Sequence, residues 1–281
     1  MNHIENRENM NHIENQWGVE RLSPDNSAEA CELLPALASN EIAAIQIAQF
    51  LGRQDLDIVI QNMSRQNIQW YENREFQQGR IGINATGFGY ESGGKQRYFD
   101  LTPEAAKVRD EIFKGASNPI DKIIKFFSSN GYNASIATEP GMQNAQYFAG
   151  LIRAMGAKST LHFDYAPNQL PGWSVSDADE QYGLVLYLQM PTEGGELTVY
   201  NRPWQPEDES HNNDIGQKGR YGFAEDFLED TPHATISPKA GDLVVFKTRN
   251  FHQVAAINSD KPRLGLTTFM TLKDGSLSLW S

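Results

Sequence analysis

A histidine and an aspartate stand two positions apart in the stretch KSTLHFDYAP, at His162 and Asp164. The residues around them, STLHFDY at 159–165, read as a β-strand. Side chains alternate between the two faces of a strand, so His162 and Asp164 are expected on one face and Phe163 on the other. An imidazole and a carboxylate on one face can bind the same metal ion. The spacing therefore predicts part of a metal site, which a residue from elsewhere must complete.

The third ligand is expected to be another histidine. His211 and His233 lie in or beside a polar segment, whereas His252 stands at the start of the strand-like run FHQVAAI. Two histidines and one carboxylate form the facial triad of non-haem Fe(II) oxygenases, which leaves positions on the metal open for cosubstrate and O₂. A His-x-Asp alone is common without a metal. The prediction rests on the ordered set HFD, GGELTVY, AGDLVVF, His252 and KPR.

About eight strand-like segments follow residue 135, separated by turns that contain proline and glycine. Short strands without intervening helices are typical of two packed antiparallel sheets, a jelly roll. The segments are residues 145–155, 159–165, 182–190, 195–201, 234–238, 242–247, 251–257 and 263–272. Residues 202–232 are a long polar connection between two of these strands, which we expect to be an insert or lid.

The N-terminal half is expected to add helices that pack on the outside of this core. Asp55 is expected to cap a helix, and residues 79–99 to form short strands and turns. Thr102 as N-cap and Pro103 at the first helical position predict the start of another helix. A further helix is predicted at Pro119–Ser129.

The composition fits a single globular domain in the cytoplasm. The 281 residues carry a formal net charge of −12 without a lysine and arginine cluster, so we expect no nucleic-acid partner. The absence of a long apolar run predicts no membrane partner, and the one cysteine fits a reducing compartment. The duplicated MNHIEN predicts a disordered tail at 1–16, followed by one domain at 17–281 with its jelly-roll core at about 135–275. The oligomeric state is not predicted.

The motifs resemble those of the Fe(II)/2-oxoglutarate-dependent oxygenases over roughly residues 135–275. The matching stretches are HFD at 162–164, GGEL at 194–197, GDLVVF at 241–246, FH at 251–252 and RLGLTTF at 263–269. Within that superfamily, GGELTVYNRPW, AGDLVVF and NFHQV…PRLGLTTFMTLK look most like the carrier-independent halogenases and hydroxylases of cyanobacterial alkaloid pathways, the welwitindolinone-type halogenase among them. The resemblance implies a mainly β fold with flanking helices, namely a double-stranded β-helix (cupin-like) core with an N-terminal α/β elaboration. It also implies catalytic Fe(II) held by His162, Asp164 and His252, with 2-oxoglutarate and O₂ as cosubstrates.

One position separates the two reactions of this subgroup. Its halogenases have a small residue in place of the carboxylate, which opens a site for chloride, but this sequence retains Asp164. The resemblance therefore implies hydroxylation coupled to the decarboxylation of 2-oxoglutarate to succinate and CO₂. Desaturation, epoxidation and halogenation stay open as alternative outcomes, and a non-catalytic cupin-type binding protein is the alternative of another class.

The distal carboxylate of 2-oxoglutarate requires a cation. Arg263 lies downstream of His252, and a guanidinium can hold a carboxylate through two parallel hydrogen bonds, which a lysine cannot. Many relatives have a serine two residues after this arginine, where this sequence has Gly265. Tyr187 matches a position at which some relatives offer a hydroxyl to the same carboxylate. Arg263 and Tyr187 are therefore the predicted cosubstrate anchors, and a binding cupin has no need of them.

The substrate is expected to be a small molecule bound near the mouth of the barrel. Candidate contacts are Phe88, Arg153, Tyr165, Asn168 and Trp173. The subgroup suggests a natural product of the alkaloid kind, and the acidic chain is compatible with a guanidine-containing, cylindrospermopsin-like toxin precursor. An amino acid or a nucleoside is left open.

Overall fold

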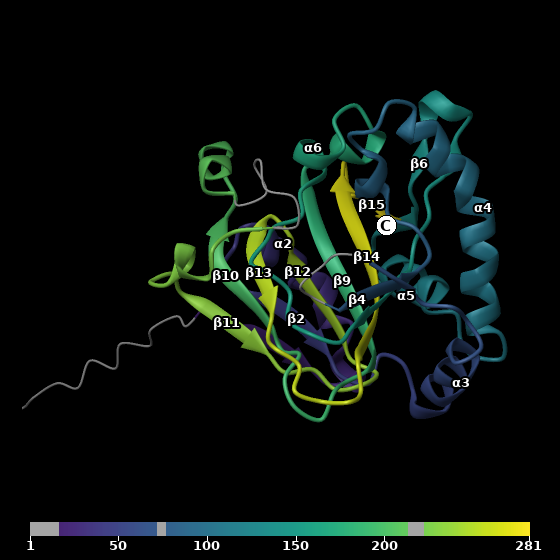
Figure 1. Cartoon of the computed structure of the whole chain (residues 1–281), viewed down its shortest axis with the longest axis horizontal. Helices are drawn as coiled ribbons and strands as arrows, with labels where there is room; N and C mark the ends of the chain where they lie inside the picture. Colours follow the sequence, from purple (N-terminus) through teal and green to yellow (C-terminus); the bar gives the residue numbers. More distant parts are fainter. Residues whose placement is uncertain (1–16, 72–76, 213–221) are drawn as a thin grey trace, which may run out of the picture.

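The computed structural model describes residues 17–71, 77–212 and 222–281, so the predicted tail at 1–16 lies outside the described residues. A ten-stranded sheet and a three-stranded sheet dominate the fold (Figure 1). The larger sheet has the order β1-β2-β12-β9-β14-β8-β4-β3, with β15 beside β14 and β5 beside β15. Its strands are β1 (Val19–Leu22), β2 (Ala44–Ile47), β3 (Gln69–Trp70), β4 (Gln78–Ile81), β5 (Asn133–Ile136), β8 (Leu151–Met155), β9 (Glu180–Gln189), β12 (Leu243–Lys247), β14 (Arg263–Lys273) and β15 (Ser276–Trp280).

The smaller sheet has the order β11-β10-β13 and runs antiparallel throughout. It consists of β10 (Leu197–Pro203), β11 (His233–Ile236) and β13 (Asn250–Val254). An apolar cluster joins the two sheets, because Val185 and Tyr187 of β9 pack together with Leu197 and Val199 of β10. A further pair of short strands, β6 (Thr138–Glu139) and β7 (Ala145–Gln146), lies apart from both.

Successive residues of β9 serve two different layers. Leu184 and Leu186 belong to the main apolar core, whereas Val185 and Tyr187 face the smaller sheet. This alternation is the period of two expected of a strand that is buried on both faces. The larger sheet therefore separates a helix-packed core from the space between the sheets.

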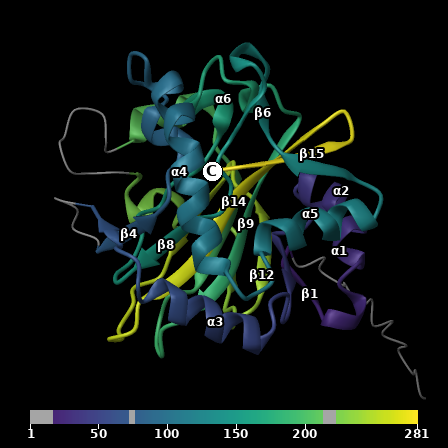
Figure 2. The same ribbon diagram turned by 90° about the vertical axis from the view of Figure 1, so that its right-hand side faces the viewer.

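Three helices cover the outer face of the larger sheet (Figure 2): α3 (Arg53–Met63), α4 (Gly94–Phe113) and α5 (Pro119–Ser129). The short helices α1 (Glu29–Glu32), α2 (Leu34–Ala38) and α6 (Ala166–Gln169) complete the α-helices of the described residues. The bounds of α5 match the prediction, because Pro119 stands at its first position and the Asn118 side chain accepts a hydrogen bond from the Ile120 N–H.

The predicted starts of the other two helices were wrong. Helix α3 begins at Arg53, and Asp55 lies in its first turn, where its carboxylate accepts a hydrogen bond from the Ser117 N–H. Helix α4 begins at Gly94, so Thr102 and Pro103 lie inside it. Proline has no N–H to offer the carbonyl four residues earlier, at Phe99. The Thr102 hydroxyl donates to that carbonyl at 3.0 Å, which replaces the missing bond and lets the helix continue.

Two other segments differ from prediction. Residues 79–99 contain strand β4, a 3₁₀ turn at Ala85–Phe88 and the first residues of α4. Residues 159–165 form no continuous strand and make only single bridges. The connection at 202–232 contains 3₁₀ turns at Pro206–His211 and Glu225–Leu228; residues 213–221 lie outside the described part, and the lid role stays a prediction. Among the described residues, no helix is long and apolar enough to cross a membrane.

Candidate active site

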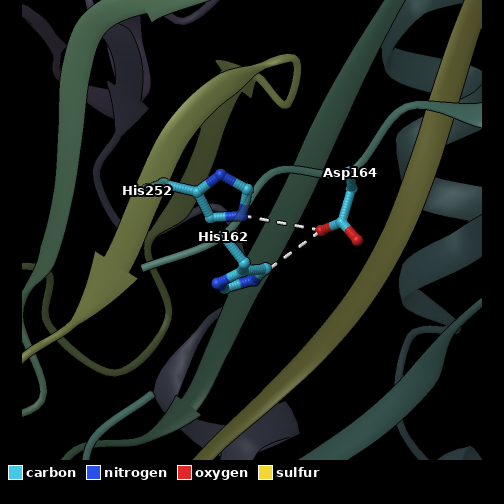
Figure 3. Close-up of side chains that lie close together, drawn as sticks. All are labelled: His162, Asp164 and His252. Atoms are coloured by element: carbon cyan, nitrogen blue, oxygen red, sulfur yellow. Dashed lines mark ion pairs between the residues drawn. The ribbon is translucent and has the colours of Figure 1, made fainter. Parts of the chain in front are cut away.

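The three predicted metal ligands lie close together and point toward one another (Figure 3). His162, Asp164 and His252 each offer a ligand atom, and these atoms lie within 4.8 Å of one another. A carboxylate oxygen of Asp164 lies 3.5 Å from Nε2 of His252 and 3.9 Å from Nε2 of His162. No other group of three histidine, cysteine or acidic side chains in the described residues meets the same criterion. Two imidazoles and one carboxylate are the donor set of the facial triad for Fe(II).

Backbone hydrogen bonds position the segment that carries His162 and Asp164. His162 and His252 form an antiparallel bridge, with N–H to carbonyl distances of 3.0 and 2.8 Å. The Asp164 N–H donates to the Thr248 carbonyl at 2.9 Å. Phe163 points away and stacks on Trp204, with ring centroids 4.6 Å apart. Single bridges thus produce the alternation of side chains that a strand was expected to give.

A buried glutamine fixes the same segment from β9. The Gln181 amide N–H₂ donates to the Asp164 carbonyl at 3.2 Å and to the Thr248 hydroxyl at 3.1 Å, and its oxygen accepts from the Ala166 N–H at 2.8 Å. Each hydrogen-bonding atom of this amide has a protein partner. Gln181 therefore ties the chain from Asp164 to Ala166 to the larger sheet.

Both imidazoles are oriented through Nδ1. Nδ1 of His162 lies 2.8 Å from the Thr160 carbonyl, and Nδ1 of His252 lies 2.9 Å from the Asn250 carbonyl. A carbonyl can only accept, so Nδ1 carries the proton and Nε2 presents its lone pair to the other ligands. Metal-binding histidines are commonly oriented in this way.

The electrostatics of the cluster favour the forms of these groups that bind metal. Burial, together with the charge of His252, lowers the pKa of His162 to about 4. Burial alone would raise the pKa of Asp164, but the hydrogen bond with His252 and the charges of His162, His252 and Arg153 lower it to about 2. The site thus holds an ionised carboxylate beside a neutral imidazole at neutral pH.

A cavity of about 360 Å³ opens beside the triad and is lined by residues of both sheets. Arg263, only 4% exposed, lines it from β14. One terminal guanidinium nitrogen donates to the Tyr187 hydroxyl at 3.2 Å and the other contacts the Met155 sulfur at 3.1 Å, while Nε is buried without a partner. Sulfur is a weak acceptor, and no carboxylate of the described residues pairs with this arginine. A buried cation in this state fits the distal carboxylate of 2-oxoglutarate.

The glycine at position 265 has a packing explanation. Gly265 lies directly opposite Tyr187 on β9 and Arg153 on β8. A β-carbon at this position would lie 3.3 Å from Cγ1 of Val185, closer than most such contacts. A serine here would require Val185 to shift by a few tenths of an ångström, and the Tyr187 hydroxyl is the group beside Arg263 that can donate to a carboxylate.

The comparison with protein families agrees with this geometry. Residues 21–280 match the family model described as the carrier-protein-independent halogenase WelO5. The chain belongs to the WelO5 family. It is an Fe(II)/2-oxoglutarate-dependent oxygenase, and its cofactors are Fe(II), 2-oxoglutarate and O₂.

Two curated proteins are similar to this WelO5-family chain. Leucinostatins biosynthesis cluster protein S of Purpureocillium lilacinum is 29% identical over 170 residues, which cover 59% of this chain and 68% of that protein. The L-γ-glutamyl-L-propargylglycine hydroxylase of Streptantibioticus cattleyicolor is 21% identical over 267 residues, covering 88% and 91%.

A solved structure confirms the predicted fold of the WelO5-family chain. An N-substituted L-amino acid dioxygenase from Burkholderia ambifaria, in complex with α-ketoglutarate, matches with a TM-score of 0.60 at 16% identity, over 90% of this chain and 91% of that one. Such oxygenases have a double-stranded β-helix core. The prediction of a mainly β, jelly-roll core with flanking helices is therefore confirmed.

The five predicted substrate contacts of the WelO5-family chain occupy different surroundings. Arg153 lines the cavity. Phe88 and Trp173 are buried in an aromatic cluster around Tyr98, and Tyr165 packs against Trp204; these three do not line the cavity.

Asn168 also lies outside the cavity lining and uses its side chain to bond Glu209. The roles of all five residues in substrate binding stay predictions.

Sequence reasoning overlooked one charged residue of the cavity, Arg80 on β4. It pairs in register with Arg153 of β8. The alternation in QGRI, with polar Gln78 and Arg80 on one face, was the available signal. The pairing partner of β4 lies about seventy residues further along the chain and cannot be read from local pattern.

Proposed function

We propose that this WelO5-family chain hydroxylates a C–H bond of a small-molecule natural product. In that reaction one oxygen atom of O₂ enters the product as a hydroxyl and the other enters succinate, while 2-oxoglutarate loses CO₂. The observation that carries the proposal is Asp164, whose carboxylate lies within 4 Å of both histidine Nε2 atoms. A carboxylate at this position fills the place that a halide would need.

Different residues of the chain would bind the iron and the cosubstrate. His162, Asp164 and His252 would bind Fe(II) through Nε2 and carboxylate oxygens. Arg263 would bind the distal carboxylate of 2-oxoglutarate, and Tyr187 would donate a second hydrogen bond to it. Bound iron and 2-oxoglutarate supply the oxidising chemistry. The apolar walls around Val185, Leu197 and Phe246 would keep water from the reacting atoms.

The printed names of the curated relatives support the choice of hydroxylation. One is a hydroxylase of a γ-glutamyl amino acid, and the other belongs to a biosynthesis cluster. Both favour a product of specialised metabolism, and the first favours a substrate derived from an amino acid. The alkaloid suggested by the family resemblance stays a prediction.

Anaerobic titration of the protein with Fe(II) and then 2-oxoglutarate tests the cofactor roles. We expect the visible charge-transfer band of an Fe(II)–2-oxoglutarate complex, its loss in Asp164→Ala, and a large increase in the 2-oxoglutarate concentration required in Arg263→Gln. The surface variant Arg53→Gln, on α3 and outside the cavity lining, is the matched control. A wild-type protein without this band would overturn the proposal.

Product analysis separates hydroxylation from halogenation. The enzyme is supplied with O₂ and candidate substrates, N-acylated amino acids and small alkaloids, in the presence of excess chloride. Addition of one oxygen atom to the substrate with formation of succinate is the expected result. A chlorinated product would show that the halogenase activity in the family name applies to this chain despite Asp164.

A further inference from the structure

Two arginines lie next to each other on one wall of the cavity. Arg80 of β4 and Arg153 of β8 are directly paired in the antiparallel ladder, and both line the cavity. Neighbouring strands lie about 4.8 Å apart, so the two side chains leave the sheet side by side. Leu151 and Met155, two residues on either side of Arg153, line the same cavity. The whole face of β8 that carries Arg153 thus points toward the site.

Neither arginine is paired with an acid among the described residues. One guanidinium nitrogen of Arg80 donates to the Asn84 side-chain oxygen at 2.8 Å, and the group lies 5.2 Å from the Tyr71 ring centroid. Arg153 is half-buried, and its guanidinium has no hydrogen bond or ion pair in the described part of the chain. Half-buried like-charged groups side by side are unfavourable unless an anion neutralises them.

Several other arginines of the described residues have carboxylate partners, although Arg249 bonds only a carbonyl and an amide oxygen. Arg109, which is more buried than Arg80 or Arg153, pairs with Asp110, and Arg202 pairs with the buried Asp208. Among the described residues, the side chains that line the cavity include three arginines (Arg80, Arg153 and Arg263) and one acidic group, Asp164.

The cofactors do not remove this excess of positive charge. Fe(II) and 2-oxoglutarate carry opposite double charges and cancel, with Arg263 assigned to the distal carboxylate. Counted over the described side chains that line the cavity, three arginines against one aspartate then leave an excess of two positive charges, at Arg80 and Arg153. This positive cavity lies in a chain whose formal net charge is −12, so the global charge does not describe the site.

We propose that the substrate carries a carboxylate and that Arg80 and Arg153 bind it. The inference rests on the proposed function, since it assumes that 2-oxoglutarate occupies Arg263. The two side chains hold the anionic end of the substrate on the β4–β8 wall, and the rest of the molecule extends along the cavity toward the triad. Arg153 is close enough to affect the triad, because its charge contributes to lowering the pKa of both His162 and Asp164. A guanidinium-bearing substrate is disfavoured at this wall.

Matched acids and amides test the proposal. A set of N-acylated amino acids with small, branched and aromatic side chains is titrated, each as the free acid and as the primary amide, into anaerobic Fe(II)–2-oxoglutarate enzyme by calorimetry. We expect at least one acid to bind about tenfold or more tightly than its amide, the difference that a charge-assisted hydrogen bond gives. Arg153→Gln and Arg80→Gln should each reduce this preference, whereas Arg153→Lys should keep part of it and Arg53→Gln all of it. Thermal melting verifies that each variant is folded.

The 2-oxoglutarate affinity of the same variants identifies the source of the carboxylate. It should stay within about twofold of wild type in Arg153→Gln and Arg80→Gln, because a lost interaction that the cosubstrate does not make leaves its affinity unchanged. Suppose that Arg153→Gln lowers the affinity for 2-oxoglutarate as much as Arg263→Gln does, while acids still bind more tightly than their amides. Arg153 would then be assigned to the cosubstrate, and the proposal would be overturned. The proposal also fails if no acid binds more tightly than its amide. It fails as well if both Arg80→Gln and Arg153→Gln keep the preference for the acid.

Failure of the proposed function would look different. In that case wild-type enzyme would show no 2-oxoglutarate band at all. The acid and amide series is therefore repeated on metal-free protein, where a preference that depends on Arg80 and Arg153 would support an anion site even without oxygenase chemistry.

Discussion

The two halves of the cavity are built in different ways. The metal half combines β13 of the small sheet with the segment at 161–164, which is held by single bridges and by Gln181. The arginine half stands on β4, β8 and β14, which are joined by continuous antiparallel ladders. Metal ligands must converge on one point, which a bent and locally bonded segment can achieve. Cations that hold an extended anion are better placed in a row, which the register of a sheet provides.

Removal of a metal ligand should give the largest loss of affinity in the series, a loss of Fe(II) binding, without changing the structure of the arginine half. Loss of an outer partner of a ligand typically costs about 10- to 100-fold in metal affinity. Asp164→Ala removes a ligand itself, so we expect Fe(II) affinity to fall by more than about 100-fold, measured by anaerobic titration. An unchanged iron affinity would remove Asp164 from the site.

Arg263→Gln should weaken the binding of 2-oxoglutarate and leave the metal half unchanged. A hydrogen bond to a charged group contributes about 1.5–3 kcal/mol, so we expect 2-oxoglutarate to bind at least about tenfold more weakly. Fe(II) affinity in the absence of 2-oxoglutarate should not change. A parallel loss of both affinities would show that the halves are not independent.

Gln181→Met tests whether side-chain hydrogen bonds hold the metal half. The substitution keeps the volume of the side chain but removes the bonds to the Asp164 carbonyl, the Thr248 hydroxyl and the Ala166 N–H. By analogy with other second partners of metal ligands, Fe(II) affinity should fall by about tenfold. Thermal melting separates this effect from global destabilisation, and a wild-type iron affinity in a folded variant would contradict it.

Tyr187→Phe should give the smallest effect of the series. The hydroxyl is one neutral donor beside Arg263, and such a bond contributes about 1 kcal/mol. The 2-oxoglutarate affinity should therefore fall by about fivefold, with iron affinity unchanged. An effect as large as that of Arg263→Gln would mean that Tyr187 also holds the guanidinium in position.

Prediction from sequence succeeded where the signal was local. Asn118, Pro119 and a run of apolar residues at helical spacing define α5, and the spacing of His162 and Asp164 places both on one side of the chain. The same local reasoning failed at Thr102 and Pro103, which look like a helix start. There the threonine hydroxyl repairs the gap that the proline leaves inside α4.

The features of the fold and the site that could not be predicted depend on contacts between distant segments of the chain. Strand β4 carries Arg80 to the cavity only because it pairs with β8, and β15 pairs with β5 across more than a hundred residues. The room beside a glycine depends on such contacts too, since a β-carbon at residue 265 would lie 3.3 Å from Cγ1 of Val185 on the neighbouring strand. These pairings are set by the packed fold, and the composition of each strand alone does not predict them.

The alternation along β9 also determines which changes the protein can accept as it evolves. Val185 borders the cavity, whereas Leu186 lies in the helix-packed core. Point substitutions on the cavity side can reshape what the enzyme accepts while the core stays intact. An insertion or deletion of a single residue within the strand would exchange the two sides, sending leucines into the site and cavity residues into the core. New substrate preferences in relatives of this chain should therefore arise by replacement at every second position of these strands, and changes in chain length should be confined to the connections between them.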